Sequence, residues 1–153
     1  MSRPLLTRAH AAAGSLACVL ILSFWTSTAA VELLGSDPAI ARVKLVIAGC
    51  LPVLVAALAT TGLTGRRLCG PTPRGLAARK LTRLKIAAAN GVLVLIPAAL
   101  FLAVRSAHGQ FGTGFAIVQA VELVAGPINL VLLGLNMRDG MRMSGRFRKV
   151  ASV

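Results

Sequence analysis

Apolar residues along this chain fall into four long blocks that are separated by short polar connectors. The blocks run over about residues 11–34, 40–63, 86–104 and 115–135. Each is close to the ~20 residues that a helix needs to cross a ~30 Å hydrocarbon layer. Strands of a membrane barrel would instead alternate in ~10-residue segments, and that alternation is absent. Because a segment in lipid must satisfy its own backbone hydrogen bonds, the pattern predicts an all-α integral membrane protein with four transmembrane helices.

Composition excludes a water-soluble domain, although 153 residues would be enough for one. Hydrophobic residues make up 56% of the chain, charged residues only 14%, and the mean hydropathy is +0.80. Soluble proteins carry about 25% charged residues. The first block resembles a secretory signal, since Arg3 and Arg8 precede it and small residues occupy positions 27–30. The apolar stretch continues to Leu34, which is longer than a signal requires, so we expect a retained span.

Positive charge is distributed unevenly among the connectors. The amino terminus, the segment between the second and third blocks, and the tail hold fourteen of the seventeen Lys and Arg residues, which leaves Arg42, Lys44 and Arg105. Lys and Arg accumulate on the cytoplasmic side, so both termini are predicted there, as in a multi-pass protein of a bacterial-type inner (plasma) membrane. Anionic lipid headgroups are the expected partners of this charge. Aromatic residues are only 4% of the chain and do not interleave with the basic ones, which argues against nucleic acid.

The chain also matches itself when it is shifted by 75 residues. About a quarter of ~65 aligned positions are identical, including Leu6-Thr7-Arg8 with Leu81-Thr82-Arg83, and Pro52 with Pro127. This similarity predicts two tandem repeats, residues 1–75 and 76–153, each a helical hairpin that starts on the cytoplasmic side. The hairpins are then parallel, related by a pseudo-twofold axis along the membrane normal, and the second carries a basic cytoplasmic tail. Each matched proline frees a carbonyl that a neighbour or water must satisfy.

Polar residues inside the fourth block are the leading site candidates, because such residues are expensive in lipid. At ~100° per residue, one stripe of that helix contains Gln119, Glu122, Gly126, Asn129 and Asn136. Glu122 is interpreted either as a proton- or cation-binding carboxylate or as a buried group held by an interhelical hydrogen bond or by Lys44. Asn90, near the inner end of the third block, is expected to form one interhelical hydrogen bond with Asn129.

A second candidate set gathers at the predicted outer ends of the helices and contains Glu32, Lys44, Arg105 and His108. Glu32 and Lys44 lie near the same short turn, so they are predicted to pair across the first hairpin. This set is either an ordinary interfacial rim or the vestibule of a pathway.

The sequence contains no recognisable motif for a metal or a cofactor site, and we predict neither a metal nor a cofactor. Four-helix membrane cytochromes use facing histidines, whereas the predicted topology places His10 and His108 on opposite sides of the membrane. The cysteines Cys18, Cys50 and Cys69 match no zinc spacing and no disulfide framework. No phosphate-binding loop, dinucleotide fingerprint or nucleophile elbow is present. A lipid, quinone or pigment between the helices remains open.

These patterns favour a protein that is not an enzyme. Its extramembrane segments are short and its spans carry few polar groups, so we expect an accessory, assembly or structural subunit that packs against other membrane proteins or itself. The alternative is a small oligomeric transporter or channel that uses Glu122 for proton or cation coupling.

Overall fold

The computed structural model of the chain describes residues 2–70 and 74–143, and within these ranges helices joined by short connectors are the only regular secondary structure. The elements are α1 (Arg3–Leu34), α2 (Asp37–Cys69), α3 (Leu76–Asn90), the π-helical turn η1 (Gly91–Leu95), α4 (Ile96–Ala107) and α5 (Thr113–Met143). Helices α3, η1 and α4 follow one another without a break. The described chain thus has four helices that are long and apolar enough to cross a membrane, as predicted.

The helices are longer than the apolar blocks from which they were predicted. Helix α1 begins at Arg3 instead of residue 11, and the third helix begins at Leu76 instead of residue 86. A helix closes its hydrogen bonds within itself, so it continues through polar sequence after the apolar stretch has ended. Part of the predicted basic tail is therefore the last turns of α5, while residues 144–153 and the prolines of 71–73 lie outside the described residues.

Proline and glycine mark the helix ends. Pro4 and Pro38 occupy the first turns of α1 and α2, where the missing N–H costs no hydrogen bond. Gly70 follows α2 with a φ of 73°, and Gly109 follows α4 with a φ of 67°. Such positive φ values are accessible to glycine without a steric penalty, so the chain turns at these two positions.

The π-helical turn has a local cause in Pro97. Proline cannot donate a hydrogen bond to the carbonyl four residues earlier, and its ring crowds that carbonyl. The N–H of Ile96 donates to the carbonyl of Gly91, five residues earlier, which widens the turn immediately before the proline. A single π turn of this kind lets a long helix pass a proline without ending.

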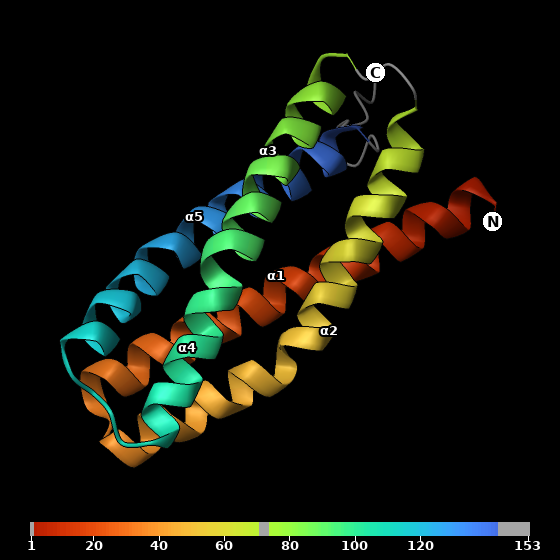
Figure 1. Cartoon of the computed structure of the whole chain (residues 1–153). Coiled ribbons are helices and arrows are strands. Elements are labelled where there is room, and N and C mark those ends of the chain that lie inside the picture. Colours follow the sequence, from red (N-terminus) through yellow and green to blue (C-terminus); the bar gives the residue numbers. More distant parts are fainter. Residues whose placement is uncertain (1, 71–73, 144–153) are drawn as a thin grey trace, which may run out of the picture.

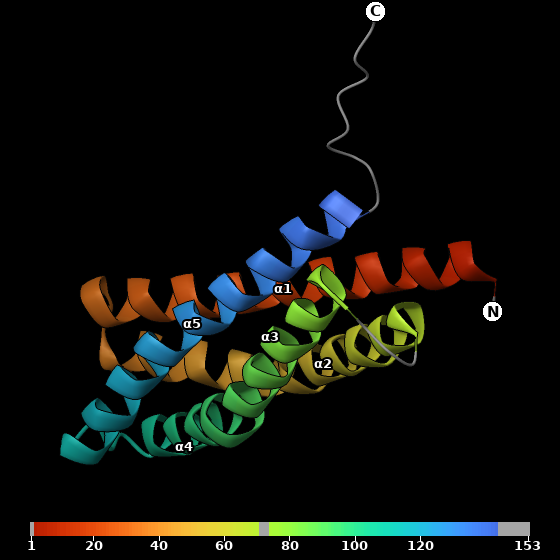
Figure 2. The ribbon, with the colours of Figure 1, turned by 90° about the horizontal axis from the view of Figure 1, so that it is seen from above.

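The four long helices form a bundle of two antiparallel pairs. Helix α1 packs along α2, and α5 packs along α3, η1 and α4; the pairs meet where α4 contacts α2 and α5 contacts α1. The amino terminus, the end of α2, the start of α3 and the end of α5 lie at one end of the bundle (Figure 1). Toward this end α2 and α3 diverge, and α5 crosses α1 obliquely when the bundle is seen from above (Figures 1 and 2).

The core between the helices is built largely from small and branched apolar side chains. One cluster includes Ala17, Ile21, Leu51, Ala87 and Ala99, and a smaller one at the opposite end joins Ile40, Leu102 and Phe115. Alanine at a crossing point lets helix backbones approach closely, which is the main source of packing energy where lipid removes the hydrophobic driving force. Many large apolar side chains point outward, including Leu33, Leu93 and Val124.

Candidate functional site

Lys44 and Glu122 form an ion pair inside the bundle. Lys44 Nζ lies 2.5 Å from Glu122 Oε2 and 3.5 Å from Thr28 Oγ1, and Gln119 Nε2 donates to the same carboxylate oxygen at 3.3 Å. The Lys44 side chain is 1% exposed and that of Glu122 14%. Helices α1, α2 and α5 meet at this cluster. Of the two interpretations of Glu122, the structure shows the carboxylate paired with Lys44.

The position of Lys44 follows from the register of α2. Its buried residues include Ile40, Lys44, Ile47, Leu51 and Leu54, which recur at the three- and four-residue spacing of one helix face. Lys44 therefore belongs to the inward face. Of the two arrangements expected for Lys44, a rim residue paired with Glu32 or the partner of Glu122, the structure shows the second.

The two asparagines among the candidate residues form the expected interhelical contact. Together with Gln119, Glu122 and Lys44, they are called the polar seam below. Asn90 Nδ2 donates to Asn129 Oδ1 at 2.9 Å and to the Ala125 carbonyl at 3.0 Å, while Asn129 Nδ2 donates to the Ala87 carbonyl at 3.2 Å. Asn129 is 2% exposed. Each amide thus bonds to the other helix, so this contact joins α3 to α5 with a defined register. The predicted Asn90–Asn129 hydrogen bond is confirmed.

Trp25 is part of the seam, a role that the sequence analysis missed. Pro127 has no N–H, so the carbonyl of Leu123, four residues earlier, lacks its usual helical donor. The indole N–H of Trp25 donates to this carbonyl at 3.0 Å. Gly126 makes room for the ring, because a Cβ at that position would lie 2.9 Å from Trp25 Cδ1. The carbonyl freed by Pro127 is therefore satisfied by a neighbouring helix, as predicted, and Gly-Pro in a span was the signal for it.

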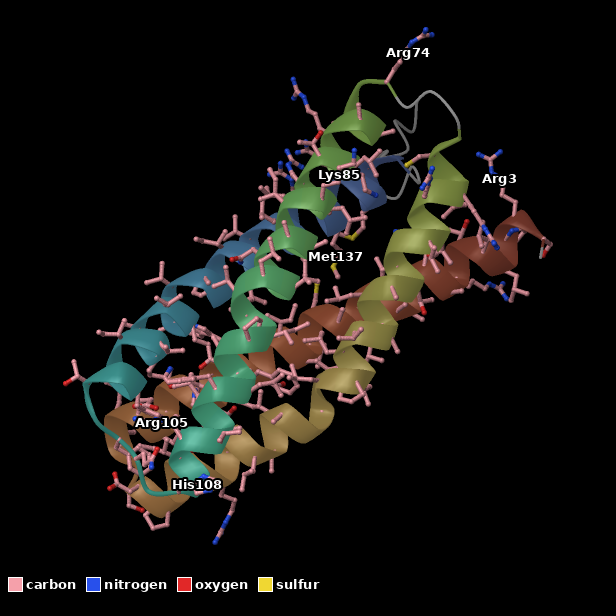
Figure 3. All side chains as sticks on the ribbon, viewed as in Figure 1. Arg3, Arg74, Lys85, Arg105, His108 and Met137 are labelled. Atoms are coloured by element: carbon pink, nitrogen blue, oxygen red, sulfur yellow. The ribbon has the colours of Figure 1, made fainter. Side chains whose placement is uncertain are left out.

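The remaining rim residues do not form a joint site. The predicted pair of Glu32 with Lys44 is absent among the described residues, since Lys44 turns inward to Glu122, and Glu32 Oε1 is buried without a hydrogen-bond partner. Arg105 lies over the Phe101 ring, 5.8 Å from its centroid. His108 is exposed and its Nδ1 bonds to the carbonyl four residues earlier. Arg105 and His108 lie at the end of the bundle opposite Arg3, Arg74 and Lys85 (Figure 3).

Polar contacts also join the helices at the end of the bundle that contains the amino terminus. Arg83 Nη1 lies 2.6 Å from Asp139 Oδ2, and Asn136 Nδ2 donates to the Lys80 carbonyl at 3.1 Å, which ties α3 to α5. Asp139 is 2% exposed and was not among the predicted site residues, because it follows the fourth apolar block in what looked like a solvated tail. These contacts have a structural role at the basic end.

His10 fastens the other pair of helices at the same end. Its Nδ1 lies 3.1 Å from both the Thr61 carbonyl and Thr64 Oγ1, and a Cβ at Gly65 would lie 3.0 Å from its ring. His10 is thus near the termini, whereas His108 is at the far end. The described residues contain no cluster of three or more His, Cys, Asp or Glu side chains arranged to hold a metal ion.

A cleft of about 620 Å³ separates α2 from the α3–η1–α4 helix, and residues of α1 and α5 complete its lining. Its walls are mostly apolar, and they include Trp25 of α1 and Glu122 and Asn129 of α5. Arg66 and Lys85 line it toward the basic end. The volume is within the ~300–1,000 Å³ range of small-molecule sites. The seam therefore borders a space that can hold a molecule, although its own polar groups are largely paired with one another.

No protein-family model, curated protein or solved structure matches this chain. The interpretation of its function therefore depends on the geometry described above.

Proposed function

We propose that this chain is a multi-pass protein of a bacterial-type inner membrane, with both termini and the basic segment around residues 66–85 in the cytoplasm. Four helices of sufficient length and apolarity support the insertion, and the Lys and Arg asymmetry supports the orientation. The contacts of α4 with α2 and of α5 with α1 are those expected if two parallel hairpins are related by a pseudo-twofold axis, which supports the proposed duplication of residues 1–75 and 76–153.

Within that membrane the protein acts as an accessory, assembly or structural subunit that packs against other membrane proteins. The observation that carries this proposal is the closure of the polar seam by the Lys44–Glu122 pair at 2.5 Å. The Glu122 carboxylate is little exposed, and it already has the buried Lys44 cation and the Gln119 amide as partners. It therefore does not require a transported ion to balance its charge. The apolar outer faces of the helices are then the surface that meets neighbouring proteins and lipid.

The test is extraction of the native protein in a mild detergent, followed by identification of what co-purifies in stoichiometric amount. A larger complex is the expected result. The double variant Lys44→Met/Glu122→Leu, which keeps the seam filled without charge, should still enter that complex. A homogeneous homo-oligomer with no other subunit would contradict the accessory role.

The cleft that reaches Glu122 favours one alternative, a small oligomeric transporter or channel. Glu122 is the more exposed member of its pair and lines this cleft, so a proton or cation that entered there would meet its carboxylate. Under this alternative, Glu122→Gln abolishes a proton or cation flux into vesicles that contain the purified protein. Flux that is absent from the unmodified protein, or unchanged in Glu122→Gln, would dismiss the alternative.

A further inference from the structure

The cleft between α2 and the third helix is a long apolar slot. Val55, Ala59 and Gly62 line it from α2, and Ala88, Val92 and Leu95 line it from the opposite side. Along α2 the lining runs from Ile47 to Arg66, which is ~28 Å at ~1.5 Å per residue. One leaflet of the hydrocarbon layer is about half of ~30 Å. The slot is therefore long enough for a whole lipid chain that enters from the basic end.

Two cations, Arg66 and Lys85, stand at that end of the slot, both exposed and on opposite walls. The described residues give neither of them an ion pair. The whole sequence contains four acidic side chains. Two of them, Glu122 and Asp139, are paired elsewhere.

The other two acids, Glu32 and Asp37, lie at the opposite end of the bundle. The 29 residues of helix between Asp37 and Arg66 correspond to ~43 Å. No side-chain carboxylate of this chain is thus placed to neutralise Arg66 and Lys85. The positive charges of Arg66 and Lys85 at the mouth of the slot can therefore be neutralised by an anion from outside the protein.

The part of the slot that is farthest from Arg66 and Lys85 is unfavourable for a polar ligand. Trp25 donates its N–H to Leu123, the Asn129 amide is bonded to α3, and Glu122 is bonded to Lys44. A ligand that carries its own polar groups to this depth would leave them unpaired at a cost of a few kcal/mol for each group. A hydrocarbon chain carries none. The slot therefore matches an amphipathic molecule whose anionic head stays at the mouth.

We propose that the slot binds an anionic phospholipid, with its phosphate between Arg66 and Lys85 and one acyl chain between α2 and α3. The inference depends on the membrane insertion proposed above, but not on the accessory role. It names a specific lipid site, in contrast to the general attraction of a basic surface for an anionic membrane. A bound chain also fills a gap that α2 and α3 leave open, and so stabilises the bundle.

Trp25 provides a direct probe, because it is the single tryptophan of the chain and borders the slot. The full-length protein is reconstituted into phosphatidylcholine vesicles that contain a minor fraction of phosphatidylglycerol with brominated acyl chains. Bromine quenches tryptophan fluorescence on close approach. The matched sample carries the bromine on the phosphatidylcholine at the same mole fraction. Stronger quenching by the anionic lipid is expected.

Charge variants separate the site from general surface attraction. Arg66→Gln and Lys85→Gln should each lower the preference for the anionic lipid about tenfold or more, because each removes a hydrogen bond to a charged phosphate, which contributes more than a basic residue that is only near the membrane surface. Arg67→Gln is the matched control, because Arg67 is exposed beside Arg66 but does not line the slot. It should lower the preference by no more than about fivefold, the contribution of one basic residue near a membrane surface. If Arg66→Gln and Arg67→Gln lowered the preference for the anionic lipid equally, the proposed site would be refuted.

Filling the slot gives the second arm of the experiment. A Cβ at Gly62 meets no atom within 4 Å, so Gly62→Phe places its ring in open space along the slot. Gly49→Phe is the matched control, because Gly49 is equally open on α2 but lies outside the lining. Gly62→Phe should abolish the preferential quenching and Gly49→Phe should retain it. Equal quenching by both lipids in the unmodified protein, or no quenching because a second copy fills the slot, would refute the proposal.

Discussion

The Lys44–Glu122 pair offers the sharpest prediction, because its two single variants and its double variant should behave in opposite ways. Lys44→Met leaves Glu122 with one amide partner, the Nε2 of Gln119 at 3.3 Å. Glu122→Leu leaves the Lys44 ammonium with the hydroxyl of Thr28 at 3.5 Å as its hydrogen-bond partner and with the charge of Glu32, which forms no ion pair with it. The double variant removes both charges and fills the same space with apolar atoms.

The magnitudes follow from burial. Removing one partner of a buried ion pair costs about 3–5 kcal/mol, because the other charge stays buried without compensation. Lys44 is 1% exposed, whereas Glu122 is 14% exposed and borders the slot. We therefore expect Glu122→Leu near the upper end of that range and Lys44→Met near the lower end. Apolar replacement of a whole buried pair is often neutral or stabilising, so the double variant should lie close to the unmodified protein.

The measurement is the free energy of unfolding in mixed micelles, by titration with a denaturing detergent and the fluorescence of Trp25 as the signal. The coupling energy is the change in the free energy of unfolding caused by the double variant minus the sum of the changes caused by the two single variants. Single variants that change stability by less than about 1 kcal/mol would show that the pair carries little net energy. A double variant as unstable as Glu122→Leu would show that the ion pair stabilises the bundle more than its apolar replacement does, and would refute the reasoning.

Three further predictions address the rest of the seam and the topology. Asn129→Leu should lower the free energy of unfolding by about 0.6–2 kcal/mol. Asn90→Leu should cost less when it is added to Asn129→Leu than when it is made alone, because only the Asn90 contact with the Ala125 carbonyl then remains; additive losses would mean that the two amides act independently. Gly126→Val should displace Trp25 and cost about 1–3 kcal/mol by overpacking, with a shift in the tryptophan emission, and an unchanged spectrum would contradict the close contact. Cys69, after replacement of the other two cysteines, should react with a membrane-impermeant maleimide in inverted vesicles but not in intact cells, and the reverse result would invert the proposed topology.

Helix existence was predictable because it depends on local chemistry. A run of apolar residues long enough for the hydrocarbon layer has one way to satisfy its backbone, whatever its neighbours are. Helix ends were less predictable, since α1 and α3 extend through basic sequence for about two and about three turns, respectively, before their apolar blocks begin. The apolar blocks predict which part of a helix can lie in lipid. The ends of the helix depend instead on where its backbone hydrogen bonds stop.

The polar seam was predictable in part. Periodicity placed Glu122 and Asn129 on one face of α5, and the structure shows that face inside the bundle. The sequence also offered Lys44 as one partner of Glu122 and Asn90 as the partner of Asn129, and the structure shows both contacts. It left open whether Lys44 pairs with Glu122 or with Glu32 at the rim, and it did not connect Trp25 with the seam. Their roles depend on the register of α2 and α1 against α5, which packing of the whole bundle determines.

The sequence by itself determined the number of long apolar helices, the uneven placement of positive charge and the scarcity of acidic side chains. Tertiary structure alone decided that Lys44 turns inward to Glu122, that Trp25 satisfies the carbonyl freed by Pro127, and that α2 and α3 diverge to leave an apolar slot. The physical reason is the distance along the chain over which each interaction acts. The backbone hydrogen bonds of a helix are formed within one segment. Ion pairs, carbonyl partners and cavities need atoms from segments that are far apart in the chain.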